Sequence, residues 1–242
     1  MKKLLLLLLL TPALLLSQQI DVFQQFNGRL DFTAFGNTLN TAENGAGGPC
    51  TILTQSSAPF ALLPGQTFVS AHLYWSGPGA GDFDVELNGT PVSAQRTFSH
   101  IAGTGLTGVI PAYCAGGTNY GGWSIVVIYQ DPSLTLNQIS LFDGLEFVSA
   151  TNQSLEIVLQ NIDISTDNLA KIGFLAWEGD QGLANNETLL IEGTLIDNPP
   201  LNPGDNAFNG TNSYTGSNQL YNMDLDVYDL TGIVMPGSTQ IT

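Results

Sequence analysis

Apolar and polar side chains alternate along short runs of this chain, and turn residues separate the runs. Phe83, Val85 and Leu87 alternate with acidic residues, and Asn88-Gly89, the strongest short hairpin signal, follows them. We therefore predict a hairpin over roughly 81–98. Beyond residues 1–17 the sequence has no convincing helical period, so the pattern predicts an all-β chain.

Longer runs predict the core strands. Trp123 to Tyr129 and Ile172 to Trp177 are apolar on both faces, which is typical of strands in the middle of a covered sheet. Thr67 to Trp75 is a third long strand with alternate apolar residues on one face. Alternation over 155–159 predicts another, half-buried strand, and weaker strands are expected near 20–26, 29–35, 106–113, 138–148, 187–196 and 219–229. About a dozen short strands favour an antiparallel β-sandwich, jelly-roll-like, as a single domain over residues 18–242.

Residues 1–17 have the pattern of a secretory signal peptide. Lys2 and Lys3 precede a leucine-rich run, and polar residues begin at Ser17. The apolar run of about 13 residues is shorter than the roughly 20 that a membrane-spanning helix needs. We predict cleavage after Ser17, a secreted or cell-surface protein, and no transmembrane segment after cleavage.

The charge and the cysteines narrow the class of protein further. The chain has 21 acidic residues and only five basic ones, a net charge of −16, so a nucleic-acid partner is not expected. In an oxidising compartment, Cys50 and Cys114 are expected to form a disulfide. Closing a loop of about 65 residues would stabilise the fold by roughly 4 kcal/mol on the chain-entropy model.

Carboxylates are the abundant reactive groups, and they have more than one interpretation. Glu178 and Asp180 follow a predicted buried strand, Asp205 lies in a turn-rich stretch, and Asp224 and Asp226 share one face of a predicted strand. They could form a solvated sheet face. Alternatively, these five could bind calcium, a hard cation that takes clustered carboxylates and backbone oxygens. Carboxylate pairs can also hydrolyse glycosidic bonds when their separation is right.

Several strings resemble one family. They are Gly122 to Tyr129 followed by Asp131-Pro132, Phe174 to Asp180, Asn206 to Thr211 and Asp224 to Tyr228. Together they resemble the N-terminal β-rich region of large surface proteins of Bacteroidetes that carry a gliding-motility-associated C-terminal domain and look like type IX secretion cargo. The resemblance implies an exported, adhesin-like protein. It supplies no catalytic residues. Relatives of this kind continue beyond the position of Thr242, so two alternatives stay open: the chain is a C-terminally truncated fragment, or it is exported by another route.

The expected function is a secreted cell-surface module with a structural or adhesive role, without catalysis, whose partner is an extracellular glycan or protein. One alternative is a filament subunit that assembles with itself. In that case Gly237 to Thr242 would form a strand with no partner left in the chain, and this strand would add to a neighbouring molecule. The other alternative is a calcium-dependent glycan-binding or glycan-active jelly roll.

Overall fold

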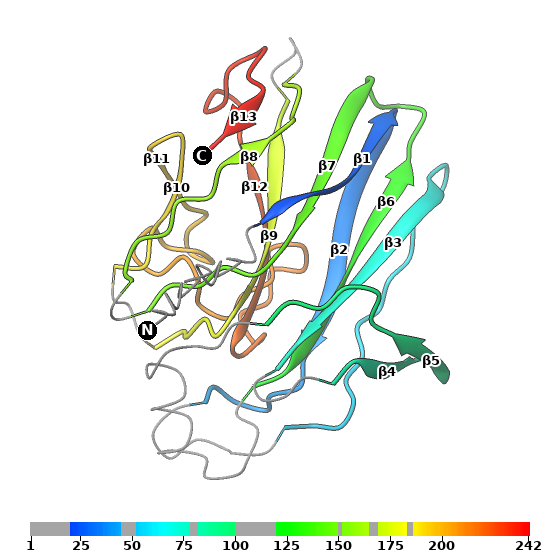
Figure 1. The fold of residues 1–242 in the computed structure, drawn as a ribbon, viewed down its shortest axis with the longest axis vertical. Helices are drawn as coiled ribbons and strands as arrows, with labels where there is room; N and C mark the ends of the chain where they lie inside the picture. Colours follow the sequence, from blue (N-terminus) through cyan, green and yellow to red (C-terminus); the bar gives the residue numbers. More distant parts are fainter. Residues whose placement is uncertain are drawn as a thin grey trace, which may run out of the picture.

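The computed structural model describes residues 20–44, 52–77, 82–99, 120–149, 152–164, 169–182 and 186–242. These residues form thirteen β-strands and no helix (Figure 1). Every pairing between two named strands is antiparallel, so the predicted all-β antiparallel fold is confirmed. The strands are β1 (Asp21–Gly28), β2 (Leu30–Thr38), β3 (Thr67–Ser76), β4 (Asp84–Leu87), β5 (Thr90–Ser93), β6 (Gly122–Gln130), β7 (Asn137–Asp143), β8 (Leu159–Gln160), β9 (Lys171–Trp177), β10 (Leu189–Ile191), β11 (Thr194–Ile196), β12 (Met223–Asp229) and β13 (Gln240–Ile241).

The largest sheet has the strand order β2-β6-β3. The central strand, β6, is the apolar run predicted from Trp123 to Tyr129, and its Ile128 side chain is fully buried. β3 is at the edge, where a β-bulge between Phe68 and Ser70 shifts the register. The alternation predicted over Thr67 to Trp75 is therefore interrupted near the start of the strand.

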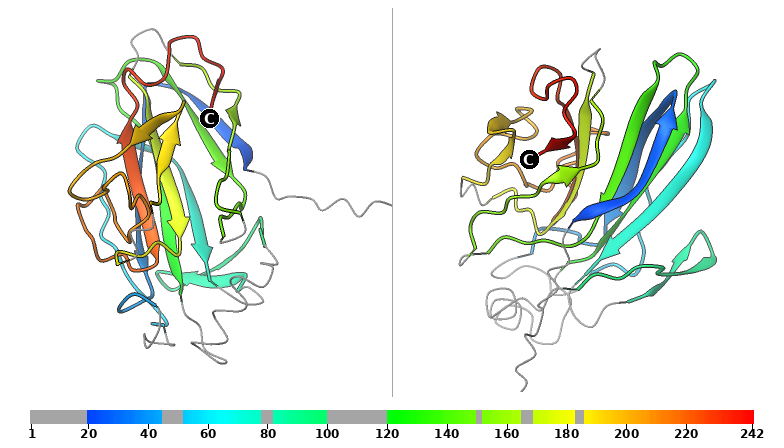
Figure 2. Two further views of the ribbon diagram at one scale, coloured as in Figure 1. Left: turned by 90° about the vertical axis from the view of Figure 1, so that its left-hand side faces the viewer. Right: turned by 45° about the horizontal axis from the view of Figure 1, so that its top comes forward.

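A second layer covers one face of this sheet (Figures 1 and 2). Ala34, Val126 and His72 share that face, because they are opposite one another in the strand register. Ala34 and Val126 pack against the β12 side chains Met223 and Leu225, whereas the His72 ring contacts two aromatic rings of β1. The β9–β12 and β1–β7 pairs thus lie on the same side of the sheet, in a sandwich-like arrangement.

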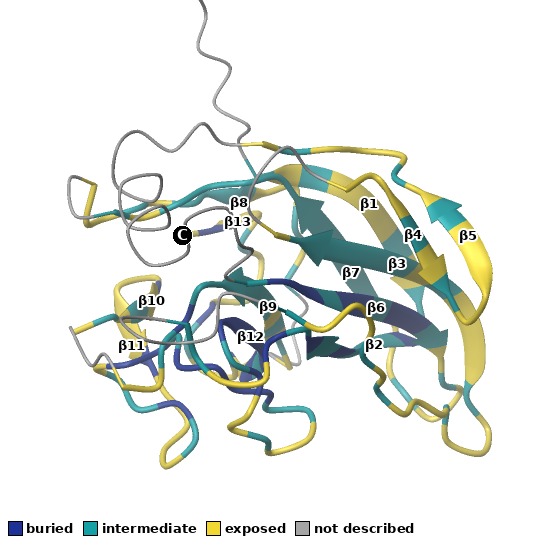
Figure 3. Cartoon of the chain, turned by 90° about the horizontal axis from the view of Figure 1, so that it is seen from below, coloured by how far each residue is buried: buried dark blue, intermediate teal, exposed yellow. Residues whose placement is uncertain are grey.

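β12 is covered on both faces, which positions the site described below. Its other face belongs to a cluster that contains Tyr228, Leu230 and the β10–β11 side chains Ile191 and Ile196. Figure 3 shows buried residues along β2, β6 and β12, whereas the β4–β5 hairpin is largely exposed. That hairpin is the one predicted over 81–98, and its turn residues Asn88 and Gly89 both have positive φ.

Four expectations need correction. Of the run predicted as a strand over 155–159, only Leu159 lies in a strand, the two-residue β8. The run predicted as one strand near 187–196 is a hairpin, in which β10 pairs with β11. β9, expected in the middle of a sheet, belongs to a two-stranded pair with β12, and its apolar faces are covered by packing from other segments. The C-terminal strand does have a partner in the chain: β13 pairs with β8, and Ile241 is buried.

Several predictions concern parts of the chain outside the described residues. These are the signal peptide, the strand near 106–113, and both Cys50 and Cys114. Among the residues that are described, no helix has the length and apolar character to cross a membrane.

Candidate functional site

Four of the five predicted site carboxylates lie as two pairs along the β9–β12 junction, Glu178 with Asp180 after β9 and Asp224 with Asp226 on β12. Antiparallel pairing sets Trp177 opposite Met223, so the residues after β9 lie beside the start of β12. The Glu178 N–H donates to the Asn222 carbonyl at 2.8 Å, and the Asn222 side-chain amide donates to Asp180 at 3.3 Å. The fifth carboxylate, Asp205, is exposed in the segment between β11 and β12.

Asp224 and Asp226 do not form a solvated sheet face. They are only 1 % and 2 % exposed, because the irregular segment 197–215 covers that face of β12. Asp224 Oδ1 accepts the backbone N–H groups of Asn209, Gly210 and Thr211 at 2.9, 2.9 and 3.1 Å. Three successive N–H groups directed at one oxygen hold this turn of the segment on the strand.

Asp226 holds the same segment at a second point. Its carboxylate accepts the Ser213 N–H at 2.9 Å, the Thr211 hydroxyl at 3.1 Å and the Asn202 side-chain amide at 3.1 Å. Asn202 is itself only 1 % exposed. A single parallel bridge between Asn212 and Leu225 also pairs this segment with β12, and the two aspartates add side-chain hydrogen bonds that fix the path of 197–215 over the strand.

The second oxygen of Asp224 is closely enclosed. Oδ2 is buried and has no hydrogen-bond partner among the described residues. A Cβ at Gly179 would lie 2.0 Å from this oxygen and 2.8 Å from the Phe208 carbonyl oxygen, so only glycine fits there. Burial is the main cause that raises the pKa of Asp224 to about 7; the Asp226 charge adds to the rise, and the backbone donors oppose it.

Glu178 is held in an unusual conformation beside this network. Its φ of 68° is in the left-handed region, which is unfavourable for a residue other than glycine. The Asn44 side-chain amide donates to both Glu178 carboxylate oxygens at 3.0 and 3.1 Å. Burial raises the pKa of Glu178 to about 7; the Asn44 hydrogen bond opposes this rise, and the Asp180 charge adds to it.

The network has no evident metal geometry. Within the described ranges, no group of three or more His, Cys, Asp or Glu side chains is placed to hold a metal ion. Amide and hydroxyl donors occupy oxygens of Asp224, Asp226, Glu178 and Asp180. Calcium binding by these residues stays a prediction.

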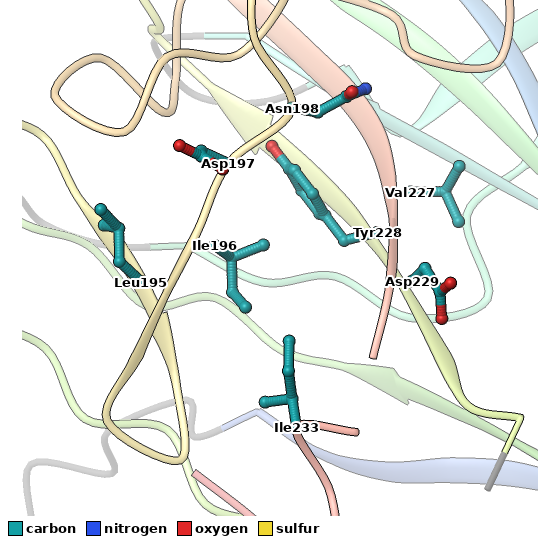
Figure 4. A pocket seen from close by; sticks show the side chains of 8 residues that line it. All are labelled: Leu195, Ile196, Asp197, Asn198, Val227, Tyr228, Asp229 and Ile233. Atoms are coloured by element: carbon teal, nitrogen blue, oxygen red, sulfur yellow. The ribbon is translucent and has the colours of Figure 1, made fainter. Parts of the chain in front are cut away.

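An open pocket of about 400 Å³ lies next to this network, between β11 and the end of β12. Figure 4 shows the Tyr228 hydroxyl directed toward Asp197 and Asn198. The complete lining is Leu195, Ile196, Asp197, Asn198, Val227, Tyr228, Asp229 and Ile233. The pocket thus combines Asp197, Asn198 and the Tyr228 phenol with aliphatic residues, whereas the Asp229 side chain points to the opposite face of β12 from Tyr228.

The pocket combines rigid and accessible side chains. Tyr228 is 5 % exposed, and its ring meets that of Phe174 edge-on at 6.3 Å. Asp197 and Asp229 are exposed, as is Leu195. Hydrogen bonds from Thr231 lower the pKa of Asp229, which is therefore ionised at neutral pH. The charged and aliphatic side chains at the rim are therefore accessible to a ligand, whereas the Tyr228 ring at the base is held by packing.

A second, smaller hollow of about 280 Å³ lies between β2 and residues 59–63. Its walls include the Phe35 and Phe60 rings, which stack with centroids 4.5 Å apart, and Tyr129. No charged side chain lines it. It therefore has fewer groups that could distinguish one polar ligand from another than the pocket beside β12 has.

Sequence reasoning missed most of the pocket and most of the partners in the network. Asp197 and Tyr228 were not candidates, and neither were the buried asparagines. The available signal was the number of asparagines in 198–212, a segment with no strand pattern. Such a segment can bury its backbone only if side chains form hydrogen bonds with the backbone N–H and C=O groups that have no strand partner. Polar residues there are therefore expected to be structural.

The fold defines the class of this chain: an all-β protein with antiparallel strands in a sandwich-like arrangement. No family model, curated protein or solved structure matches it. Function must therefore be argued from the pocket and its surroundings.

Proposed function

We propose that this chain is a secreted, cell-surface adhesive module that binds an extracellular glycan in the pocket beside β12, without catalysis. The observation that carries the proposal is the pocket between β11 and the end of β12, where Asp197 and Asn198 lie near the Tyr228 hydroxyl and the lining includes the aliphatic residues Leu195, Ile196 and Ile233. An adhesive role is also what the resemblance to surface proteins implies.

The chemistry of the lining suits a sugar ring. Sugars offer hydroxyl groups that donate to carboxylate and amide oxygens, and C–H faces that pack on apolar surface. Binding sites commonly combine an apolar wall with a few convergent polar groups. Leu195 is 48 % exposed on a short hairpin, and it supplies such a wall at the pocket rim.

Binding suits this pocket better than hydrolysis does. Glycosidases need one carboxylic acid that keeps its proton near neutral pH. In the pocket, Asp229 has a lowered pKa and is a hydrogen-bond acceptor. The carboxyl groups whose pKa is raised to about 7, Glu178 and Asp224, do not line the pocket, and Asp224 is buried.

The test is a glycan array followed by titration calorimetry with the best ligand. Asp197→Ala and Leu195→Ala should each weaken binding about tenfold or more, because a hydrogen bond to a charged group or an apolar contact is lost. The matched controls Asp205→Ala and Leu136→Ala change exposed residues outside the pocket and should bind as the parent does. An array without binding, or pocket variants that bind normally, would refute the proposal.

A further inference from the structure

The main sheet ends at β3, and no described strand pairs with the far side of this strand. In Figures 1 and 2, β3 is the outer strand of the sheet, and the β4–β5 hairpin lies near its C-terminal end. Ala71 is exposed, and so are Phe68 and Val69, at 57 % and 39 %. This edge of the sheet is therefore open to solvent.

Hydrogen-bond geometry shows which main-chain groups of β3 point outward. The Leu39 N–H donates to the Gly121 carbonyl at 2.7 Å and continues the β2–β6 ladder, so the odd-numbered residues of β6 bond to β2. The even-numbered residues of β6 bond to β3, where they lie opposite the even-numbered residues from 70 to 76. The N–H and C=O groups of Ala71 and Leu73 therefore point away from the sheet. No described residue hydrogen-bonds to them.

β3 has few of the features with which proteins protect an edge strand. Its ten residues, Thr67–Ser76, include no charged residue and no proline. The bulge between Phe68 and Ser70 interrupts only the first part of the strand. An edge of this kind is a template for a strand from another chain, because unpaired main-chain groups give affinity and neighbouring side chains give specificity.

Acidic residues lie at both ends of this edge. Gln66, the residue before β3, donates to Asp131 at 3.3 Å. Hydrogen bonds from Ser133 lower the pKa of Asp131, which is therefore ionised at neutral pH. At the other end, the Trp75 indole donates to the carbonyl of the exposed residue Asp82 at 2.7 Å. The edge is thus uncharged in its middle and flanked by carboxylates.

We propose that β3 receives an extended segment of a partner protein, uncharged in its middle and with Lys or Arg at both ends, as a fourth strand of the sheet. The segment would bond to the N–H and C=O groups of Ala71 and Leu73, and its basic ends would complement Asp131 and Asp82. The site shares no residue with the pocket beside β12.

A second copy of this chain is a poorer occupant of the edge. Antiparallel pairing of two copies would set the Asp131 end of one β3 beside the Asp82 end of the other. Each copy also has a net charge of −16. Like charges would therefore repel at both ends of the paired strands and between the two molecules as a whole.

The probe is a labelled peptide of alternating Thr and Val, about ten residues long to match β3, with lysines at each end. One matched peptide has glutamates at its ends. Another has N-methyl groups on adjacent central residues, which block main-chain bonding. In fluorescence anisotropy at low salt, the Lys-ended peptide should bind at least about tenfold more tightly than either matched peptide.

Residue-level hydrogen exchange locates the bound peptide. The Ala71 and Leu73 amides should exchange rapidly in the free protein and at least about tenfold more slowly with the Lys-ended peptide. The His72 and Tyr74 amides bond to β6, so they should exchange slowly in both states.

A pair of variants tests the outward N–H of Ala71. Ala71→Pro removes it without removing a bond to β6, and should weaken peptide binding about tenfold. Ala71→Ser keeps this N–H and should bind as the parent does. Urea unfolding checks that both variants are folded; if Ala71→Pro is not, the exchange result decides. Glycan binding in the pocket beside β12 should be the same in all folded variants, so the two proposals fail separately.

Three results would overturn this proposal. Slow exchange of the Ala71 and Leu73 amides in the free monomer would mean that another part of the chain covers the edge. Protection that grows with protein concentration, together with a dimer in light scattering, would show that a second copy occupies it. Equal binding of the Glu-ended or the N-methylated peptide would mean that charge complementarity or main-chain pairing does not hold the segment.

Discussion

Replacing Asp224 with asparagine tests the central role given to the buried network. Burial raises the pKa of Asp224 to about 7 from its usual value of 3.8. The folded state therefore holds the proton more tightly than the unfolded state does. The resulting stabilisation is complete below about pH 4 and is lost as the pH rises to about 7. At 1.36 kcal/mol per pH unit, the loss is roughly 4 kcal/mol at most.

Asparagine should reproduce the protonated form of Asp224. Its oxygen can accept the three backbone N–H groups that Oδ1 now accepts. Its amide nitrogen would replace Oδ2, the buried oxygen beside Gly179 that accepts no hydrogen bond from the described residues. We therefore expect Asp224→Asn to be roughly 2–4 kcal/mol more stable than the parent at about pH 8, and within about 1 kcal/mol of it near pH 4.5.

Urea unfolding in the presence of chelator, at several pH values, measures this difference. The free energy of unfolding of the parent should fall between about pH 4 and pH 7 more steeply than that of Asp224→Asn. Asp205→Asn is the control, because Asp205 is exposed and should not alter the pH dependence. If Asp224→Asn is less stable than the parent at pH 8, the ionised carboxylate is satisfied in the fold and our reasoning is wrong.

Three more predictions concern packing and metal. Gly179→Ala should destabilise the fold by about 1–3 kcal/mol in urea unfolding, since its Cβ would lie 2.0 Å from Asp224 Oδ2. Gly182→Ala, whose Cβ would be 3.8 Å from the nearest atom, should change stability by less than about 0.5 kcal/mol, and equal effects would contradict the close packing. Ile241→Ala should cost about 2–5 kcal/mol, because Ile241 is 6 % exposed in a core cluster; a negligible cost would mean that β13 is not docked on β8. Because amide donors already occupy the network, chelator should leave the melting temperature unchanged, and a rise in melting temperature with calcium would favour the calcium interpretation.

Much of the fold could be predicted from local patterns. Alternation and the Asn88-Gly89 turn locate the β4–β5 hairpin, and the two-faced apolar run from Trp123 to Tyr129 locates the central strand. Both signals are local, because side-chain direction alternates along a strand and the turn needs residues that tolerate positive φ. Where the pattern was short, as over 155–159, packing decided the outcome, and only Leu159 of that run lies in a strand.

The site was only partly predictable. Sequence spacing correctly puts Asp224 and Asp226 on one face of a strand, but it suggested the wrong environment for that face. The covering segment, 197–215, has no period from which its path could be predicted. The pocket was missed for the same reason, since Asp197 lies near Tyr228 only after this segment folds over β12.

The sequence alone determined the all-β class, the positions of the longest strands and the strongly acidic character, because each depends on residue type and local spacing. Only the tertiary structure decided the rest. Antiparallel pairing of β9 with β12 brought Glu178 and Asp180 to Asp224, and the hydrogen bonds of two buried aspartates fixed an irregular segment over the strand. These are contacts between residues far apart in the chain, and their burial depends on what covers them rather than on their own neighbours in sequence.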